Sequence, residues 1–168
     1  MKTYHYVGDE AILQQANLVT RRQKVSSPTD VVTFSKETYP EPPADSLYWF
    51  TYIIGADGHL YIADRRSEHV ACSRKEPVLA AGEIAFGIAK SEAFLEHIDN
   101  RSNGFRPSTD CWEAIANALE EAQIQHEGSF TQAFEFRKCT CGHINTVRDA
   151  FFYCDICEKE LPQEYNIQ

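Results

Sequence analysis

The stretch Tyr48-Trp-Phe-Thr-Tyr-Ile-Ile54 is aromatic or β-branched at every position, which predicts a strand at the centre of the main sheet. The turn-forming residues Ala56-Asp57-Gly58 follow it and lead into a second apolar run, His59-Leu-Tyr-Ile-Ala63. The two runs therefore predict a β-hairpin. Because both runs are almost continuously apolar, we expect other elements to cover part of both faces. No basic residues interleave with the aromatic ones, so the run is expected to be core and not a platform for stacked bases.

Upstream of this hairpin the sequence predicts short elements. Asp9 is a candidate N-cap for a helix that carries Ile12, Leu13 and Ala16 on one side. The polar residues 21–24 are interpreted as a solvated surface turn. Val31-Val-Thr-Phe34 predicts a short strand, because three of its four residues are β-branched and the fourth is aromatic.

Downstream of the hairpin, the pattern predicts strands through Phe86 and Ile88 and over residues 93–98, and then a loop over 99–104. The main helix follows, capped by Ser108 or Thr109. Its apolar stripe consists of Trp112, Ile115, Ala116 and Leu119. Phe134-Glu-Phe136 predicts a last strand. The fold class is therefore α+β, with a mostly antiparallel sheet and one main helix packed on it.

Two cysteine pairs near the C-terminus have the spacing of metal ligands: Cys139-Thr-Cys141 and Cys154-Asp-Ile-Cys157. We expect Gly142 to need a positive φ in the first turn. A hairpin of residues 145–147 and 151–153, turning at 148–150, would bring the pairs together. The block from about Phe136 to Pro162 resembles a zinc ribbon, which implies one structural Zn²⁺ per chain. Four cysteines leave no open position for a catalytic water.

Some alternatives remain open for this C-terminal block. The first pair is Cys-x-Cys, so His143 is an alternative ligand in place of Cys139 or Cys141. A disulfide-bonded or reactive tail is the second alternative. No flexible linker separates Phe134 and Phe136 from the first pair. We therefore divide the chain into a domain of residues 1–135 and a zinc ribbon of residues 136–168 docked on it.

The composition restricts the partners. The chain has 168 residues and a formal net charge of −9 at pH 7. Nucleic-acid binders depend on basic surfaces to neutralise phosphates, so the acidic charge favours a basic or neutral protein partner. The sequence contains no apolar run of membrane-spanning length and no hydrophobic signal region at Met1-Lys-Thr-Tyr-His, so we expect a cytoplasmic protein. The isolated Cys72 and Cys111 are expected to be reduced.

Residues from about Asp64 to Leu119 partly resemble a block shared by plant calmodulin-binding IQ-motif proteins and by bacterial proteins, some associated with toxin systems. That block has a histidine-serine-serine run, a leucine-alanine-alanine-glycine turn, a strand pair and a serine-to-proline loop that opens a helix. Here Leu79-Ala-Ala-Gly82 and Ser102-Asn-Gly-Phe-Arg-Pro107 match it, and His69 takes the histidine position. Val70 and Ala71 replace the two serines. The resemblance implies a shared scaffold and a context in toxin–immunity or defence systems.

The middle of the chain also permits an enzyme or ligand-binding hypothesis. His69 could act as a base oriented by Glu68 or Glu83, with Cys72 or Cys111 as nucleophile. The candidate ligand-binding residues are Arg66, His69, Ser102, Asn103 and Arg106. The favoured hypothesis is a zinc-ribbon binding or adaptor protein with a protein partner. An enzyme or small-ligand site around His69, Glu83 and 102–107 is the first alternative, and a nucleic-acid-binding ribbon is the second.

Overall fold

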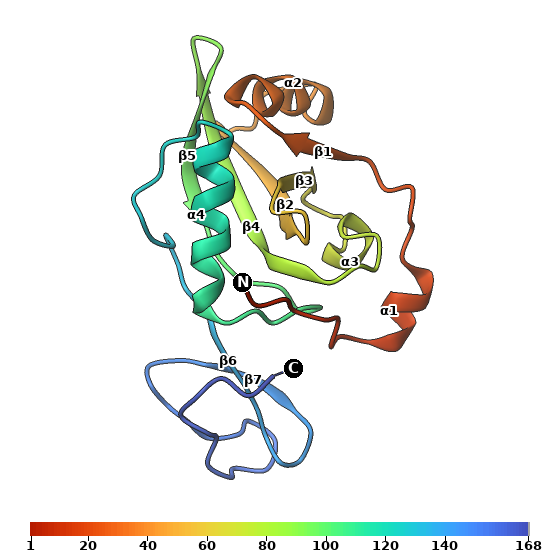
Figure 1. Cartoon of the computed structure of the whole chain (residues 1–168), viewed down its shortest axis with the longest axis vertical. Helices are drawn as coiled ribbons and strands as arrows, with labels where there is room; N and C mark the ends of the chain where they lie inside the picture. Colours follow the sequence, from red (N-terminus) through yellow and green to blue (C-terminus); the bar gives the residue numbers. More distant parts are fainter. Residues whose placement is uncertain (168) are drawn as a thin grey trace.

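The computed structural model describes residues 1–167, and its centre is an antiparallel five-stranded sheet (Figure 1). The strand order is β1-β3-β2-β4-β5. The bounds are β1 (Arg22–Val25), β2 (Leu47–Gly55), β3 (Leu60–Asp64), β4 (Val78–Ala89) and β5 (Glu92–Ile98). The predicted hairpin is confirmed as β2 and β3, which pair from Phe50↔Asp64 to Ile54↔Leu60. Gly58 has φ +82° in its turn and donates its N–H to the Gly55 carbonyl.

Within residues 1–167, four α-helices accompany the sheet: α1 (Glu10–Gln15), α2 (Pro28–Thr38), α3 (His69–Cys72) and α4 (Trp112–Glu121). Asp9 caps α1 as expected, accepting the Ala11 N–H. A 3₁₀ turn (Thr109–Cys111) precedes α4, and Ser108 caps it. The α+β class is therefore confirmed, although α2 is as long as α4 and the prediction of one main helix was incomplete.

The helices lie on two faces of the sheet. Phe50 and Thr51 are consecutive on β2 and point to opposite faces. On the Phe50 face, Phe34 of α2 lies 5.6 Å from the Phe50 ring, and α4 contacts β2, β3 and β4. On the Thr51 face, the Thr51 hydroxyl donates to the carbonyls of the loop before α3. The central hairpin is therefore covered on both sides, as its apolar character predicted.

Three local predictions were wrong. Residues 31–34 are helical, because Pro28 begins α2 and the Asp30 carboxylate accepts the Ser27 N–H at 3.0 Å in a capping box. Residues 22–25 form the edge strand β1, whose polar residues suit a half-exposed strand. The Leu79-Ala-Ala-Gly82 segment lies within β4 and is not a turn.

Gly82 of β4 lies directly against Asp99, the residue that follows β5. A Cβ at this position would lie 2.1 Å from the Asp99 carbonyl oxygen. That carbonyl also accepts the buried Tyr52 hydroxyl at 2.7 Å. The Asp99 carboxylate accepts the N–H groups of Glu83 and Arg101. The loop that follows β5 is therefore fixed to the centre of the sheet.

The chain then reaches a separate C-terminal hairpin, formed by β6 (Glu135–Lys138) and β7 (Ile144–Val147) and lying below the sheet in Figure 1. Asn100, which has no exposed surface, joins the two parts. Its amide accepts the Phe134 N–H at 2.7 Å and donates to the carbonyls of Phe134 and Pro107. The division at residue 135 stays a prediction. No helix within residues 1–167 is long and apolar enough to cross a membrane.

Candidate metal centre

The first cysteine pair lies in a tight turn between β6 and β7. The Cys139 N–H donates to the His143 carbonyl at 2.8 Å, and the Gly142 N–H donates to the Cys139 carbonyl at 2.9 Å. Gly142 has φ +93°, a conformation that glycine adopts without the cost that a side chain would add. The predicted positive φ is thus confirmed, and it brings the Cys139 and Cys141 side chains to one side of the turn.

The second pair occupies a similar turn. The Glu158 N–H donates to the Cys154 carbonyl at 3.0 Å, and the Cys154 N–H donates to the Lys159 carbonyl at 2.9 Å. The predicted strand pairing between the cysteine pairs was wrong in detail. β7 pairs with β6, and residues 148–151 form a tight turn with only the Arg148↔Phe151 bridge. Asp149 and Ala150 both take positive φ in this turn, and beyond it Tyr153 forms a bridge with Glu160 instead of pairing with β7.

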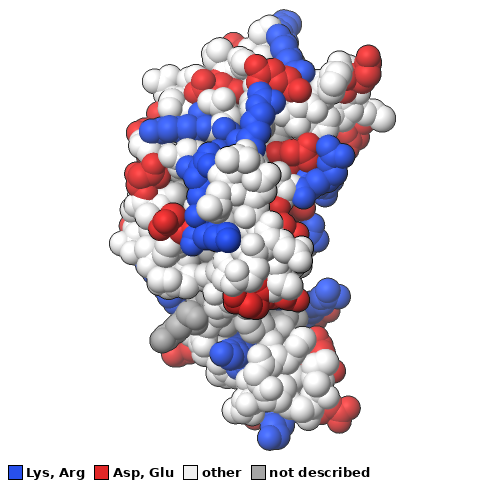
Figure 2. Space-filling model, turned by 90° about the vertical axis from the view of Figure 1, so that its right-hand side faces the viewer, with Lys and Arg blue, Asp and Glu red and all other residues white. Residues whose placement is uncertain are grey.

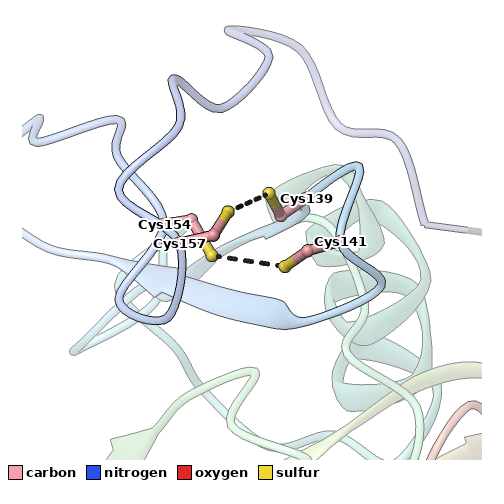
Figure 3. A group of neighbouring side chains, drawn as sticks. All are labelled: Cys139, Cys141, Cys154 and Cys157. Carbon is pink, nitrogen blue, oxygen red and sulfur yellow. Dashed lines mark hydrogen bonds between the residues drawn. The ribbon is translucent and has the colours of Figure 1, made fainter.

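The four thiol groups converge (Figure 3). All four sulfur atoms lie within 4.8 Å of one another, with 3.5 Å between Cys139 and Cys157 and 3.7 Å between Cys141 and Cys154. A disulfide would require about 2.05 Å between sulfurs. A tetrahedron of Zn–S bonds of about 2.3 Å places sulfurs about 3.8 Å apart. The cluster therefore has the size and chemistry of a four-thiolate metal site.

Asn145 supports this cluster from the side and was missed by the sequence analysis. It is 2% exposed, and its amide donates to the Cys154 sulfur at 3.6 Å while accepting the Asp155 N–H at 2.9 Å. The Ile156 N–H also points at the Cys154 sulfur, at 3.4 Å. Burial opposes ionisation of this thiol, but hydrogen bonds from the backbone N–H groups of Cys157 and Ile156, together with those of the Asn145 and Cys139 side chains, outweigh it and lower the pKa of Cys154 to about 6. A thiolate is the form that binds a metal.

His143 is not part of this cluster among the described residues. Its side chain is exposed, and only its backbone carbonyl takes part in the first turn. The geometry therefore favours four cysteines over the alternative set with His143.

The surface next to the cysteine cluster carries exposed apolar side chains. Phe151 is 63% exposed, Ile156 69% and Tyr153 47%. The Phe151 and Tyr153 rings are 5.0 Å apart. They line a hollow of about 280 Å³ together with His143, Arg148 and Asp155. Ile156 does not line this hollow, but it is exposed between the ligands Cys154 and Cys157. We call the two rings of Phe151 and Tyr153, together with the Ile156 side chain, the aromatic patch.

The candidate residues of the middle block lie partly together. His69, Glu83, Arg66 and Asn103 line one hollow of about 330 Å³. The imidazole is engaged, because its Nε2 lies 2.9 Å from the Gly82 carbonyl, and burial lowers the pKa of His69. Glu83 is paired with Arg101 at 2.7 Å. These contacts favour a role in fixing the fold over a role in catalysis.

The side chains of the other candidates in this block are buried, form hydrogen bonds with neighbouring residues or lie outside the hollow. Ser102 is buried, and its hydroxyl accepts the Phe105 N–H. Arg106 donates to the Asn103 carbonyl and lies over the Phe136 ring, outside the hollow. Arg66 donates three hydrogen bonds to the Asp64 carboxylate, two from its guanidinium and one from its backbone N–H. The candidate nucleophiles are buried, which raises the pKa of Cys72 to about 12 and raises that of Cys111 as well.

A nucleic-acid interface on the hairpin would require its basic side chains to share an exposed face. Arg137 is only 8% exposed, and its guanidinium donates to the carbonyls of Pro162 and Gln163. Figure 2 shows the side of the molecule that carries α1 and β1. On this side the C-terminal hairpin has scattered charges of both signs, and Lys and Arg on the main domain are interspersed with Asp and Glu. Neither observation favours phosphate binding by the hairpin.

Comparisons of the chain with protein-family models, with curated proteins and with solved structures find no match, so the resemblance of residues 64–119 receives no support from them.

Proposed function

We propose that the chain is a zinc-binding adaptor in which four cysteines hold one structural Zn²⁺ and the C-terminal hairpin docks on a protein partner through the aromatic patch. The observation that carries this proposal is the composition of the hairpin's own apolar cluster. Its buried members are Cys139, Cys154 and Leu161. Such a cluster is too small to stabilise a fold by apolar burial, and a metal is the usual substitute.

The choice of zinc rests on the donor set. Thiolates are soft ligands, and a closed tetrahedral set of four is typical of structural zinc. With four protein ligands no position is left for a substrate or a catalytic water. The metal is therefore assigned to stability, and the function is assigned to the surface that the metal holds in place.

The choice of a protein partner rests on the surface. Three large apolar side chains lie close to the metal site and are about half to two-thirds exposed. Exposed aromatic rings in the centre of a patch are typical of residues that dominate protein–protein binding energy.

The charge of the hairpin restricts the kind of partner. Residues 136–167 contain five carboxylates and four Lys or Arg side chains. A Zn²⁺ with four thiolates adds a charge of about −2, so a basic or neutral partner fits best. Residues 136–167 show no feature specific to toxin–immunity or defence systems.

The test is affinity capture of partner proteins on the zinc-loaded chain, in which the captured amount of each protein is compared between the wild type and two variants. The Phe151→Ser/Ile156→Ser variant changes two exposed side chains and should keep its metal content. Val19→Ser, at a residue that is 83% exposed on the main domain, is the matched control.

We expect a protein that both the wild type and Val19→Ser retain and that the patch variant loses. The proposal requires direct binding of that protein once it is purified. Equal capture by the patch variant and the wild type would contradict it, and so would loss of binding upon Val19→Ser alone.

A further inference from the structure

The β5 edge of the sheet lies beside a hollow of about 690 Å³. One wall of the hollow is formed by consecutive residues of the β4–β5 hairpin, Ser91 to Leu95. The other wall is formed by Pro28 and Thr29 at the start of α2 and by the segment after α4, including His126 and Glu127. The hollow therefore runs beside the part of the sheet edge that begins β5.

Most of this edge has no second partner. The Ile98 end is occupied, because Thr131 donates its N–H to the Ile98 carbonyl and accepts the Ile98 N–H. Within the part of the chain that is described, the backbone of Glu92–His97 is paired only with β4. From Glu92 to Leu95, alternate N–H and C=O groups point away from the sheet, in the arrangement that another strand needs for pairing. At Glu96 a β-bulge interrupts this arrangement, because Leu95 lies opposite Phe86 and His97 lies opposite Ala85.

The side chains of β5 alternate in a way that selects a partner. Phe94 is opposite Gly87, and the Glu96 side chain lies over Gly87 on the same face. Glu92, Phe94 and Glu96 are all exposed, and Phe94 is 48% exposed. On the other face, Ala93 and Leu95 pack against the core and line the hollow. Along β5, one face of the sheet therefore carries two carboxylates on either side of the Phe94 ring, and the other face is apolar.

We propose that the β5 edge binds an extended segment of a partner protein with alternating apolar and basic side chains, which joins the sheet as a sixth strand. Its apolar side chains enter the hollow beside Leu95, and its basic side chains lie near Glu92 and Glu96. Lys90 is the only Lys or Arg between residues 78 and 98. The same carboxylates disfavour pairing with the β5 edge of a second copy, because like charges would meet across the new ladder.

The binding probe is a ten-residue peptide of alternating valine and lysine, added to the ¹⁵N-labelled, metal-loaded full chain. We expect amide resonances of residues 92–97 to shift and to gain protection from hydrogen exchange, while those of β1 at the opposite edge do not. The first control is the same peptide with N-methyl groups on alternate residues, which removes main-chain donors but keeps every side chain. Its affinity should be lower by roughly tenfold or more, since each lost hydrogen bond contributes about 1 kcal/mol.

The second control is the Glu92→Lys/Glu96→Lys variant, whose changed residues are exposed and whose fold is checked by circular dichroism. It should lose binding to the valine–lysine peptide. The proposal is overturned if the peptide does not bind at millimolar concentration, if the N-methylated peptide binds equally well, or if the charge-reversed variant binds with unchanged affinity. Self-association of the free chain that shifts the resonances of residues 92–97 would also overturn it, because β5 would then pair with a second copy.

Discussion

Asn100→Ala should weaken the connection between the sheet and the C-terminal hairpin. The Asn100 side chain is completely buried, and it pairs with Phe134 as a strand neighbour would, accepting its N–H at 2.7 Å and donating to its carbonyl at 2.8 Å. The same amide donates to the Pro107 carbonyl at 3.0 Å, in the loop that leads to α4. The substitution removes all three hydrogen bonds at once.

The size of the expected loss in stability follows from the backbone groups that lose their hydrogen-bond partners. Alanine leaves one N–H and two carbonyls without partners, and each buried unpaired group costs about 1–3 kcal/mol. Because water can enter the space vacated by the amide and these costs are not additive, we expect a loss of about 3–5 kcal/mol in the free energy of unfolding. Asn100→Asp should be worse at pH 7, since a carboxylate oxygen would face two carbonyl oxygens.

The assay is urea unfolding of the metal-loaded chain, followed by the fluorescence of its two tryptophans. Asn103→Ala is the matched control, because Asn103 is exposed in the same loop and should change stability by less than about 0.5 kcal/mol. A loss below about 1 kcal/mol for Asn100→Ala, or equal losses for the two variants, would refute the assignment of Asn100 as the link.

Three further predictions use the same unfolding assay or thiol chemistry. Gly82→Ala should lower the free energy of unfolding by about 3 kcal/mol or more, because the new Cβ would lie 2.1 Å from the Asp99 carbonyl oxygen and the packed sheet cannot move away. Near-wild-type stability of this variant would contradict the close approach. Burial raises the pKa of Glu83, but the Arg101 hydrogen bond and the charges of two arginines outweigh it and the net shift is downward. Its ionised form therefore stabilises the fold above the unfolded pKa of about 4.3, and this contribution disappears as pH falls through the folded pKa. The stability difference between wild type and Glu83→Gln should accordingly shrink on acidification, and a difference that grows would contradict the pairing. Burial raises the pKa of Cys72 to about 12, so iodoacetamide at pH 8 should leave it unmodified in the native chain; mass spectrometry showing rapid modification before unfolding would contradict its burial.

The parts of the fold that were predictable from the sequence are those set by neighbours in the chain. The β2–β3 hairpin follows from two apolar runs and a glycine turn, and the cysteine cluster follows from its spacing. Residues 31–34 were misassigned because β-branched side chains outweighed the Ser27-Pro28-x-Asp30 capping signal, which decides the helix start.

The remaining parts depend on contacts between distant residues. Asn100 contacts Phe134, and Asn145 contacts Cys154, only after the chain has folded. In the sequence alone, an isolated asparagine predicts no more than a turn. Likewise, His69 and Glu83 looked available for chemistry because their partners, the Gly82 carbonyl and Arg101, are not recognisable as partners from spacing alone.

Elemental analysis of the chain purified without added metal tests the central claim most directly. The account predicts about one zinc per chain in the wild type. In Cys154→Ser the zinc content should fall, and residues 136–167 should lose their protection from hydrogen exchange. A metal-free wild-type chain whose C-terminal hairpin is fully protected would contradict the account.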